Sequence, residues 1–275
     1  MTTPPLLQQR ATLNPYLAAA GLLVNRLAWD LRPEAFRSRR RLDRCRDKYA
    51  GGRAVVLCNG PSLLETDFEL LRQSGVFTFG LNKINLIFDR TTWRPDAIVA
   101  VNPYVIEQNS GFYNSTGIPL YLDRCAMRSV PRRDNITYLH SASIRKFARN
   151  CRISINQGNT VTFAALQLAY HLGFERVALV GCDHRFTQTG PANLVAVSGA
   201  RDENHFDPSY FAGGVRWQYP DLVQSEISYL LARDAYEATG RTIVNCTAGG
   251  ELEVFQRQAL ADFLSGKESA PEARR

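Results

Sequence analysis

The sequence predicts an α/β fold in which a mostly parallel sheet is covered by helices on both faces. Short apolar and β-branched runs of strand length alternate along the chain with segments of helical periodicity, the pattern of parallel strands joined by crossover helices. The composition agrees, because 45% of the 275 residues are hydrophobic and 21% are charged. These values are typical of a globular domain and exclude a disordered or low-complexity chain.

The first predicted strand, Ala54–Cys58, follows a pair of glycines and leads into a predicted helix from Leu63 to about Arg72. Two clearer helices have apolar residues at helical spacing and end at glycines, one at Val161–Leu172 and one from Leu222 to about Ala238. Further strands are predicted at short apolar runs: Val76–Leu81, Ala97–Val101, Pro119–Leu122, Ile136–Leu139, Arg176–Val180 and Thr242–Cys246.

Residues 1–50 differ from the rest of the chain in charge. They hold ten Lys and Arg against four Asp and Glu, so they carry +6 of the net charge of +7. An apolar stripe at helical spacing predicts a helix that ends before Pro33; it comprises Leu13, Tyr16, Ala20, Leu23 and Leu27. We therefore divide the chain into a basic helical appendage (1–50), an α/β domain (51–264) and a disordered tail (265–275). The appendage either rests on an anionic membrane surface or packs on the domain with a solvated basic face.

Several classes of protein are not expected. No apolar run approaches the ~20 residues that span a bilayer, and no secretory cleavage site follows Leu17–Val24. The six cysteines are widely spaced, which does not suggest a disulfide framework or a metal site. Because the positive charge is confined to one end, we expect no nucleic-acid partner. The chain is predicted to be cytoplasmic, either in solution or peripheral at the inner face of the cell membrane.

Polar residues follow the predicted strands at the edge where an open α/β sheet binds its ligand. Asn59-Gly60-Pro61-Ser62 follows the first strand, Asn82 the second and Asn102 the third, and Asp183 follows the strand that begins at Arg176. Asparagine suits sugar hydroxyls, a base edge or a phosphate oxygen, although Asn and Gly also favour turns after strands. The sequence thus predicts a ligand site here and leaves the turn interpretation open.

The loop after the first strand is not a usual nucleotide-binding loop. The chain contains no G-x-x-x-x-G-K-[ST], which excludes a P-loop kinase or GTPase, and no G-x-G-x-x-G follows the first strand. A glycine at position 60 would let the backbone approach a ligand, and Ser62 would cap the next helix. Gly158-Asn159-Thr160 repeats this arrangement before the helix at Val161.

The segment from His184 to Pro220 is polar and long, as in a lid or a substrate-binding loop. Within it, His205 is the candidate general base, Asp207 is expected to orient its ring, and Tyr210 is expected to serve the leaving group. A loop histidine is also often a bystander. His140 and His171 are interpreted as structural.

The motif Cys58-Asn-Gly-Pro-Ser-Leu63, with Gly158-Asn-Thr160 and Gly181-Cys-Asp183, resembles a signature shared by two related groups. These are the Campylobacter-type bacterial sialyltransferases and the MptE-like proteins, named after an archaeal 6-hydroxymethyl-dihydropterin pyrophosphokinase. The similarity covers roughly residues 53–255 and implies a Rossmann-like fold. The His205 region resembles the MptE-like branch more closely.

The sialyltransferase resemblance implies that the loop Asn59–Ser62 contacts the phosphate and ribose of a cytidine nucleotide. It also implies that Asn82 and Asn102 line the cleft, and that Gly158, Asn159, Thr160 and Asp183 hold the nucleotide. A loop histidine deprotonates the acceptor hydroxyl in those enzymes, and tyrosines bind the departing phosphate without a metal; His205 and Tyr210 or Tyr219 are the available counterparts.

We therefore expect a glycosyltransferase-like enzyme that uses a CMP-activated, sialic-acid-type donor and a glycan acceptor in surface-glycan assembly, with no cofactor and no metal site. The alternatives are an MptE-like pyrophosphokinase that uses ATP and Mg²⁺, with Asp183 and Asp207 as possible metal ligands, and a non-catalytic nucleotide-binding protein.

Overall fold

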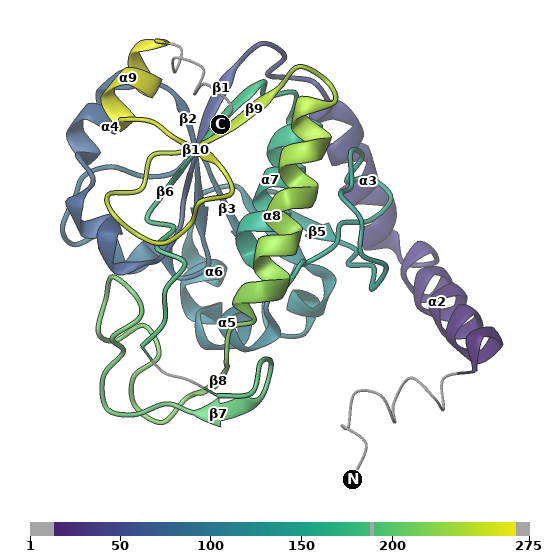
Figure 1. The fold of residues 1–275 in the computed structure, drawn as a ribbon. Helices are drawn as coiled ribbons and strands as arrows, with labels where there is room; N and C mark the ends of the chain where they lie inside the picture. The colour runs from purple at the N-terminus through teal and green to yellow at the C-terminus, as the bar shows by residue number, and fades with distance from the viewer. Residues whose placement is uncertain (1–13, 188–189, 268–275) are drawn as a thin grey trace, which may run out of the picture.

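A single parallel sheet forms the centre of the computed structural model, which describes residues 14–187 and 190–267. Its eight strands lie in the order β10-β9-β6-β1-β2-β3-β4-β5, and every pairing between them is parallel (Figure 1). The strands are β1 (Arg53–Leu57), β2 (Phe77–Leu81), β3 (Ala97–Ala100), β4 (Leu120–Asp123), β5 (Ile136–Leu139), β6 (Arg176–Val180), β9 (Thr242–Asn245) and β10 (Gln256–Arg257). The predicted Rossmann-like α/β fold is confirmed.

The order of the strands reverses between β1 and β6. From β1 the chain builds outward through β2 to β5, whereas β6, β9 and β10 extend the sheet on the other side. A crevice therefore opens at this point beyond the carboxyl ends of the strands, because the connections leave β1 and β6 in opposite directions.

Helices cover both faces of the sheet. Alternate residues of β1 divide between the two cores: Val56 packs with residues of α7 (Val161–Leu172) and α8 (Leu222–Glu237), and Leu57 packs on the opposite face. The helices of that second face are α4 (Phe68–Ser74), α5 (Pro103–Gln108), α6 (Ser110–Ser115) and α9 (Leu260–Ser265), with the 3₁₀ helices η1 (Pro61–Glu65), η2 (Ile84–Ile87) and η3 (Arg124–Arg128).

The helix predicted from Leu63 to Arg72 is two separate elements, η1 and α4. Thr66 and Asp67 between them have extended backbone, and the Asp67 side chain accepts a hydrogen bond from the Leu70 amide at 2.8 Å. Asp67 therefore begins a new helix as its N-cap and interrupts the predicted one.

The polar segment after β6 folds partly into a small antiparallel hairpin of β7 (Val195–Val197) and β8 (Arg216–Gln218). Two side chains of the sheet domain hold this hairpin. Gln108 donates to the Arg216 carbonyl at 2.7 Å, and Asn102 donates to Gln218 Oε1 at 3.2 Å. The predicted loop is thus anchored to the edge where the ligand is expected.

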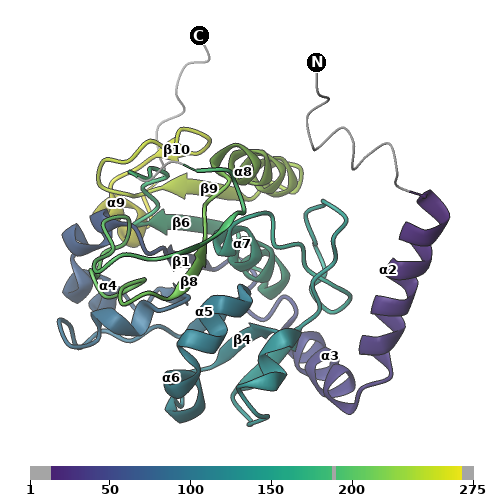
Figure 2. The same cartoon turned by 90° about the horizontal axis from the view of Figure 1, so that it is seen from below.

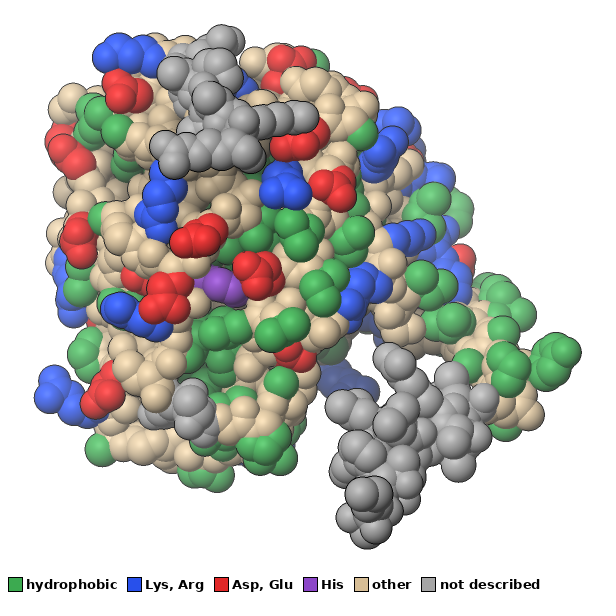
Figure 3. Space-filling model, viewed as in Figure 1, with side chains coloured by type: hydrophobic (Ala, Val, Ile, Leu, Met, Phe, Trp, Pro, Cys, Tyr) green, Lys and Arg blue, Asp and Glu red, His purple; other side chains and the backbone are tan. Residues whose placement is uncertain are grey.

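At the N-terminus, α2 (Pro15–Asp30) projects from the domain, as Figure 1 and Figure 2 show. Hydrophobic side chains are exposed along it (Figure 3). Leu13 of the predicted stripe and the end of the predicted tail, residues 268–275, lie outside the described residues. No helix in the described part of the chain combines the length and apolar character needed to cross a bilayer.

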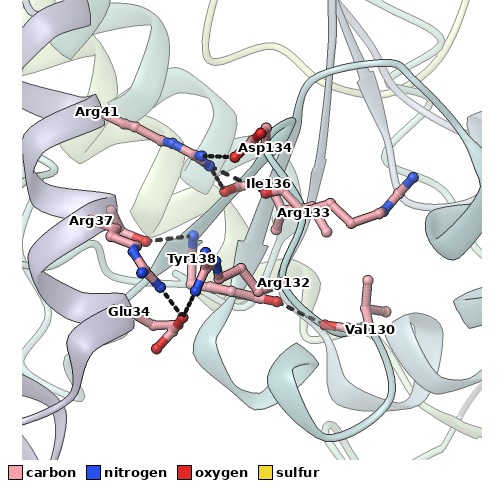
Figure 4. A network of polar contacts seen from close by, with 10 residues as sticks. Glu34, Arg37, Arg41, Val130, Arg132, Arg133, Asp134, Ile136 and Tyr138 are labelled. Carbon is pink, nitrogen blue, oxygen red and sulfur yellow. Dashed lines mark hydrogen bonds and ion pairs between the residues drawn. The ribbon is translucent and has the colours of Figure 1, made fainter.

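By contrast, α3 (Pro33–Cys45) packs against β5. Ala35, Ser38 and Leu42 are buried, and the Ser38 hydroxyl accepts a hydrogen bond from the Tyr138 amide at 3.0 Å. Arg41 donates to the Ile136 carbonyl, as Figure 4 shows. The packed surface therefore begins at α3, ahead of residue 51, and Pro33 starts a helix as its first residue.

Candidate functional site

A cleft of about 650 Å³ opens at the reversal of strand order, beyond the carboxyl ends of β1 and β6. Its volume lies in the range of small-molecule sites. Most of the residues predicted from the sequence line it: Asn59, Gly60, Asn82, Asn102, Gly158, Asn159, Thr160, Asp183, His205 and Tyr210. Pro61, Ser62 and Asp207 are not among the lining residues.

The loop after β1 is held against the loop after β6. Ser62 donates from its hydroxyl to Asp183 Oδ2 at 2.8 Å, and the Gly60 amide donates to the Gly181 carbonyl at 2.9 Å. A Cβ at position 60 would lie 1.8 Å from Asp183 Oδ2. Gly60 therefore makes room for Asp183 and also lines the cleft. The structure corrects the expectation for Ser62, which orients that carboxylate and makes no side-chain cap of η1.

Asn59 faces the cleft with an unused acceptor. It is buried, and its Oδ1 has no hydrogen-bond partner among the described residues. Its carbonyl accepts from the Phe206 amide at 3.0 Å, which joins the first loop to the segment that carries His205. A ligand donor, such as a ribose hydroxyl or a base amine, would satisfy the buried oxygen.

The turn Gly158–Thr160 places the N-terminus of α7 in the cleft wall. Gly158 and Asn159 both have positive φ, of 57° and 62°, and Thr160 accepts a hydrogen bond from the Thr162 amide as the N-cap. A Cβ on Gly158 would meet Phe163 at 2.3 Å, so the turn requires glycine. The helix dipole makes this end favourable for phosphate.

Asn82 and Asn102 also have local structural roles. Asn82 adopts φ of 48°, and its carbonyl accepts from the Tyr113 hydroxyl at 2.9 Å. Asn102 caps α5 through its Oδ1 and binds Gln218 through its Nδ2. Turn and cap formation therefore account for Asn102, which lines the cleft with both polar groups already in use.

His205 is oriented by a carboxylate that the sequence did not indicate. Its Nδ1 lies 2.8 Å from Asp202 Oδ2, and its ring stacks on Tyr210 with centroids 4.0 Å apart. Burial alone would raise the pKa of Asp202, but hydrogen bonds from His205 and from backbone amides outweigh it and lower that pKa. The Nε2 atom makes no hydrogen bond to the described residues, and His205 lines the cleft.

Asp207, expected to orient His205, faces elsewhere. Its Oδ1 accepts from the amide and hydroxyl of Ser209 at 2.9 and 2.6 Å, and its Oδ2 lies 3.4 Å from Arg90. It therefore caps the local turn. No helical or strand pattern in the sequence signalled Asp202 as the partner of His205, because the segment between them is irregular.

Tyr210 supports the His205 ring by stacking. It is fully buried, and burial raises the pKa of its hydroxyl well above the usual value. Tyr219 also lines the cleft and is half-buried, so it presents the more accessible hydroxyl. The buried His140 and His171 contact Asn25 and Leu42 instead and do not line the cleft.

Two arginines that the sequence analysis did not select lie at the cleft rim. Arg145 and Arg185 are exposed lining residues, and Arg185 has no ion-pair or hydrogen-bond partner among the described residues. Cys58 and Cys182 lie deeper, as buried free thiols. The rim thus carries cations suited to a phosphate.

The carboxylates of the cleft are few. Among residues 14–187 and 190–267, no three His, Cys, Asp or Glu side chains gather closely enough to hold a metal ion. Asp221 caps α8 with its Oδ1, whereas Asp183 keeps its Oδ1 free of hydrogen bonds to the described residues.

The chain matches one protein family over much of its length. The family described as "6-hydroxymethylpterin diphosphokinase MptE-like" matches residues 34–189, so the match starts within α3 and ends before His205. No curated protein sequence matches. The fold is similar to the solved structure of the MAf glycosyltransferase from Magnetospirillum magneticum AMB-1, with a TM-score of 0.51 and 14% identity. The alignment covers 78% of this chain and 34% of that one, so this chain spans about a third of that protein.

Proposed function

Because the chain belongs to the MptE-like family, we propose that it is a glycosyltransferase-like enzyme that uses a CMP-activated, sialic-acid-type donor. The acceptor would be a glycan in surface-glycan assembly. One observation carries the proposal: a single cleft brings a phosphate-suited helix N-terminus, an unsatisfied Asn59 oxygen and a carboxylate-oriented histidine together.

In the proposed reaction, His205 Nε2 takes the proton of the acceptor hydroxyl as its oxygen attacks the anomeric carbon. The bond from that carbon to the CMP phosphate oxygen breaks, and CMP leaves with the electron pair. Asp202 holds the Nδ1 proton and stabilises the positive ring. The N-terminus of α7, Arg185 and the Tyr219 hydroxyl would stabilise the departing phosphate.

Ligand-induced thermal shift with CMP, CTP and ATP, each with and without Mg²⁺, tests the nucleotide. We expect CMP to raise the melting temperature without a metal in the wild type and in Asn114→Ala, an exposed asparagine of α6. The shift should vanish in Asn59→Ala. No response to CMP in any condition would contradict the proposal, and stabilisation without turnover of any donor would favour a non-catalytic binding protein.

A second candidate, pyrophosphoryl transfer from ATP to a pterin alcohol, is favoured by the family's description and by Asp183. Mg²⁺ is commonly held by one or two carboxylates together with substrate phosphates. The free oxygen of Asp183 at the carboxyl edge fits that manner of binding, whereas Asp207 faces Arg90 outside the cleft lining. The ion would neutralise charge on the transferred phosphates. Stabilisation by ATP only with Mg²⁺ would favour this candidate.

A further inference from the structure

The helix α2 presents its large apolar side chains away from the domain. Six of them are exposed, and Leu22, the least exposed, lies outside the sector that the other five share. At 100° per residue these five fall within a sector of about 120°: Tyr16, Leu17, Leu23, Val24 and Leu27. Trp29, the buried residue of the helix, lies on the opposite side and stacks on His140. The outward sector therefore has no apolar partner among the described residues.

Charge is confined to the end of α2 that joins the domain. No charged residue occurs from position 15 to 25, and contact with the domain begins at Asn25 and Arg26. Arg26 donates to the Ile153 carbonyl, and Arg124 donates to the Asn25 carbonyl at 3.3 Å. The outer part of α2, residues 15–25, is thus uncharged, whereas the end that contacts the domain, which we call the base of the helix, is polar.

Arginines from four segments surround that base; we call Arg26, Arg39, Arg124 and Arg152 the arginine collar. Asp30 pairs with Arg26 and Arg39, and Asp43 pairs with Arg152, so two carboxylates face four guanidinium groups. Burial and the like charge of Arg152 lower the pKa of Arg26, so these two members of the collar lie close enough to repel each other. The adjoining segment 141–155 adds Arg145, Lys146 and Arg149 and contains no acidic residue.

We propose that the outward sector of α2 inserts into the surface of an anionic membrane while the arginine collar and segment 141–155 contact lipid phosphates. Apolar side chains of an interfacial helix lie at the boundary between headgroups and acyl chains, and anionic lipid attracts nearby basic residues. Figure 3 shows hydrophobic side chains on the projecting helix and basic side chains where it meets the domain. Ile144 and Ile153 of segment 141–155 are exposed as well.

A second copy of the chain would complement this surface poorly. It would bring the same arginine collar against the first, and each copy has a net charge of +7. Anionic lipid supplies both the apolar phase and the opposite charge. The same segment 141–155 lines the cleft at Ser141, Ala142, Ser143 and Arg145, so one piece of chain joins the membrane-facing surface to the cleft.

Co-sedimentation of the full chain with vesicles tests the proposal. We expect binding to vesicles of 70% phosphatidylcholine and 30% phosphatidylglycerol, weakened by raising the salt concentration, and little binding to phosphatidylcholine alone. The triple variant Leu17→Gln, Leu23→Gln and Val24→Gln should reduce the partition coefficient at least tenfold. The matched control, Leu64→Gln with Val223→Gln and Leu230→Gln, replaces three exposed apolar residues elsewhere and should bind like the wild type.

Two further variants separate the apolar and the charged contribution. Lys146→Gln with Arg149→Gln should weaken binding several-fold only when phosphatidylglycerol is present. Leu23→Trp should gain quenching by brominated phospholipid, because the three native tryptophans are buried. Equal vesicle binding by the apolar triple variant and its control would overturn the proposal. So would a wild-type dimer in sedimentation velocity that the triple variant makes monomeric, if vesicles do not bind.

Discussion

The imidazole rings of His205 and His140 lie in two different electrostatic environments. His205 lines the cleft, with Nδ1 on the carboxylate of Asp202 and Nε2 without a hydrogen bond to the described residues. His140 lies beneath α2, with Nε2 on the neutral Asn25 amide and Nδ1 buried without a hydrogen bond to them. Burial and the neighbouring Arg26 and Arg124 lower the pKa of His140 to about 4. One region places a carboxylate against the ring, and the other keeps the ring neutral.

The comparison teaches that a functional histidine is recognised by its partner and its accessible nitrogen. His140 follows the strand Ile136–Leu139, whereas His205 lies in a polar segment, and neither local pattern reveals which histidine has a carboxylate.

Removing the cleft histidine should have the largest effect. His205→Ala should lower turnover roughly 10²- to 10⁴-fold, the usual contribution of a positioned acid or base. Nucleotide affinity from calorimetry should change little, because we expect Asn59 and the N-terminus of α7 to hold the nucleotide. His140→Gln is the matched control and should keep near-normal turnover; normal turnover of His205→Ala would instead transfer the role to His184.

Removing only the carboxylate charge should have the next largest effect. Asp202→Asn keeps the shape but no longer favours the proton on Nδ1, so turnover should fall roughly 10- to 100-fold. Asp207→Asn should leave steady-state kinetics nearly unchanged, since Asp207 contacts Ser209 and Arg90 and not His205. The opposite ranking of these two variants would show that the ring is oriented differently during turnover.

Removing one buried hydroxyl should have a smaller effect. Tyr210→Phe retains the ring stacked on His205, so turnover should stay within about threefold of the wild type. Tyr219→Phe, measured in parallel, should slow donor cleavage more. A loss in Tyr210→Phe as large as that in His205→Ala would restore the hydroxyl of Tyr210 as the group that serves the leaving phosphate.

The smallest effect should be on the stability of the region around His140. Its pKa is lowered from about 6.5 to about 4, so the unfolded chain binds this proton more readily than the folded one. Stability is fully present above pH 6.5 and is lost as the pH falls towards 4. The melting temperature should drop by a few degrees between pH 7.5 and 5, and less in His140→Gln. An identical drop in that variant would show that other groups cause it.

Ligands of open α/β sheets bind beyond the carboxyl ends of the strands, and this rule predicted much of the cleft. It can be applied without knowing the full order of the strands in the sheet. Asn59, Gly158 and Asp183 follow or precede apolar elements that were visible in the sequence. The contact of Ser62 with Asp183 was not predictable, because it requires β1 and β6 to be neighbours although more than a hundred residues separate them. Asp202 was missed because no periodic pattern reveals contacts within an irregular segment.

The sequence also did not show which faces of the N-terminal helices are buried. Periodicity predicted the apolar stripe of α2 but not whether Tyr16, Leu23 and Leu27 face the domain or solvent. Likewise, the basic composition of α3 concealed the buried face of Ala35, Ser38 and Leu42, since only the position of β5 makes that face interior. Which face of a helix points towards the domain depends on tertiary packing, and local periodicity does not determine it.

The most direct test of the account is release of CMP from CMP-N-acetylneuraminate, measured for the wild type and His205→Ala in the presence of EDTA. Release by the wild type without a metal, reduced at least 10²-fold in the variant, is the result we predict. The account would be contradicted if the wild type released no CMP but formed AMP from ATP, Mg²⁺ and 6-hydroxymethylpterin, at a rate that His205→Ala leaves unchanged.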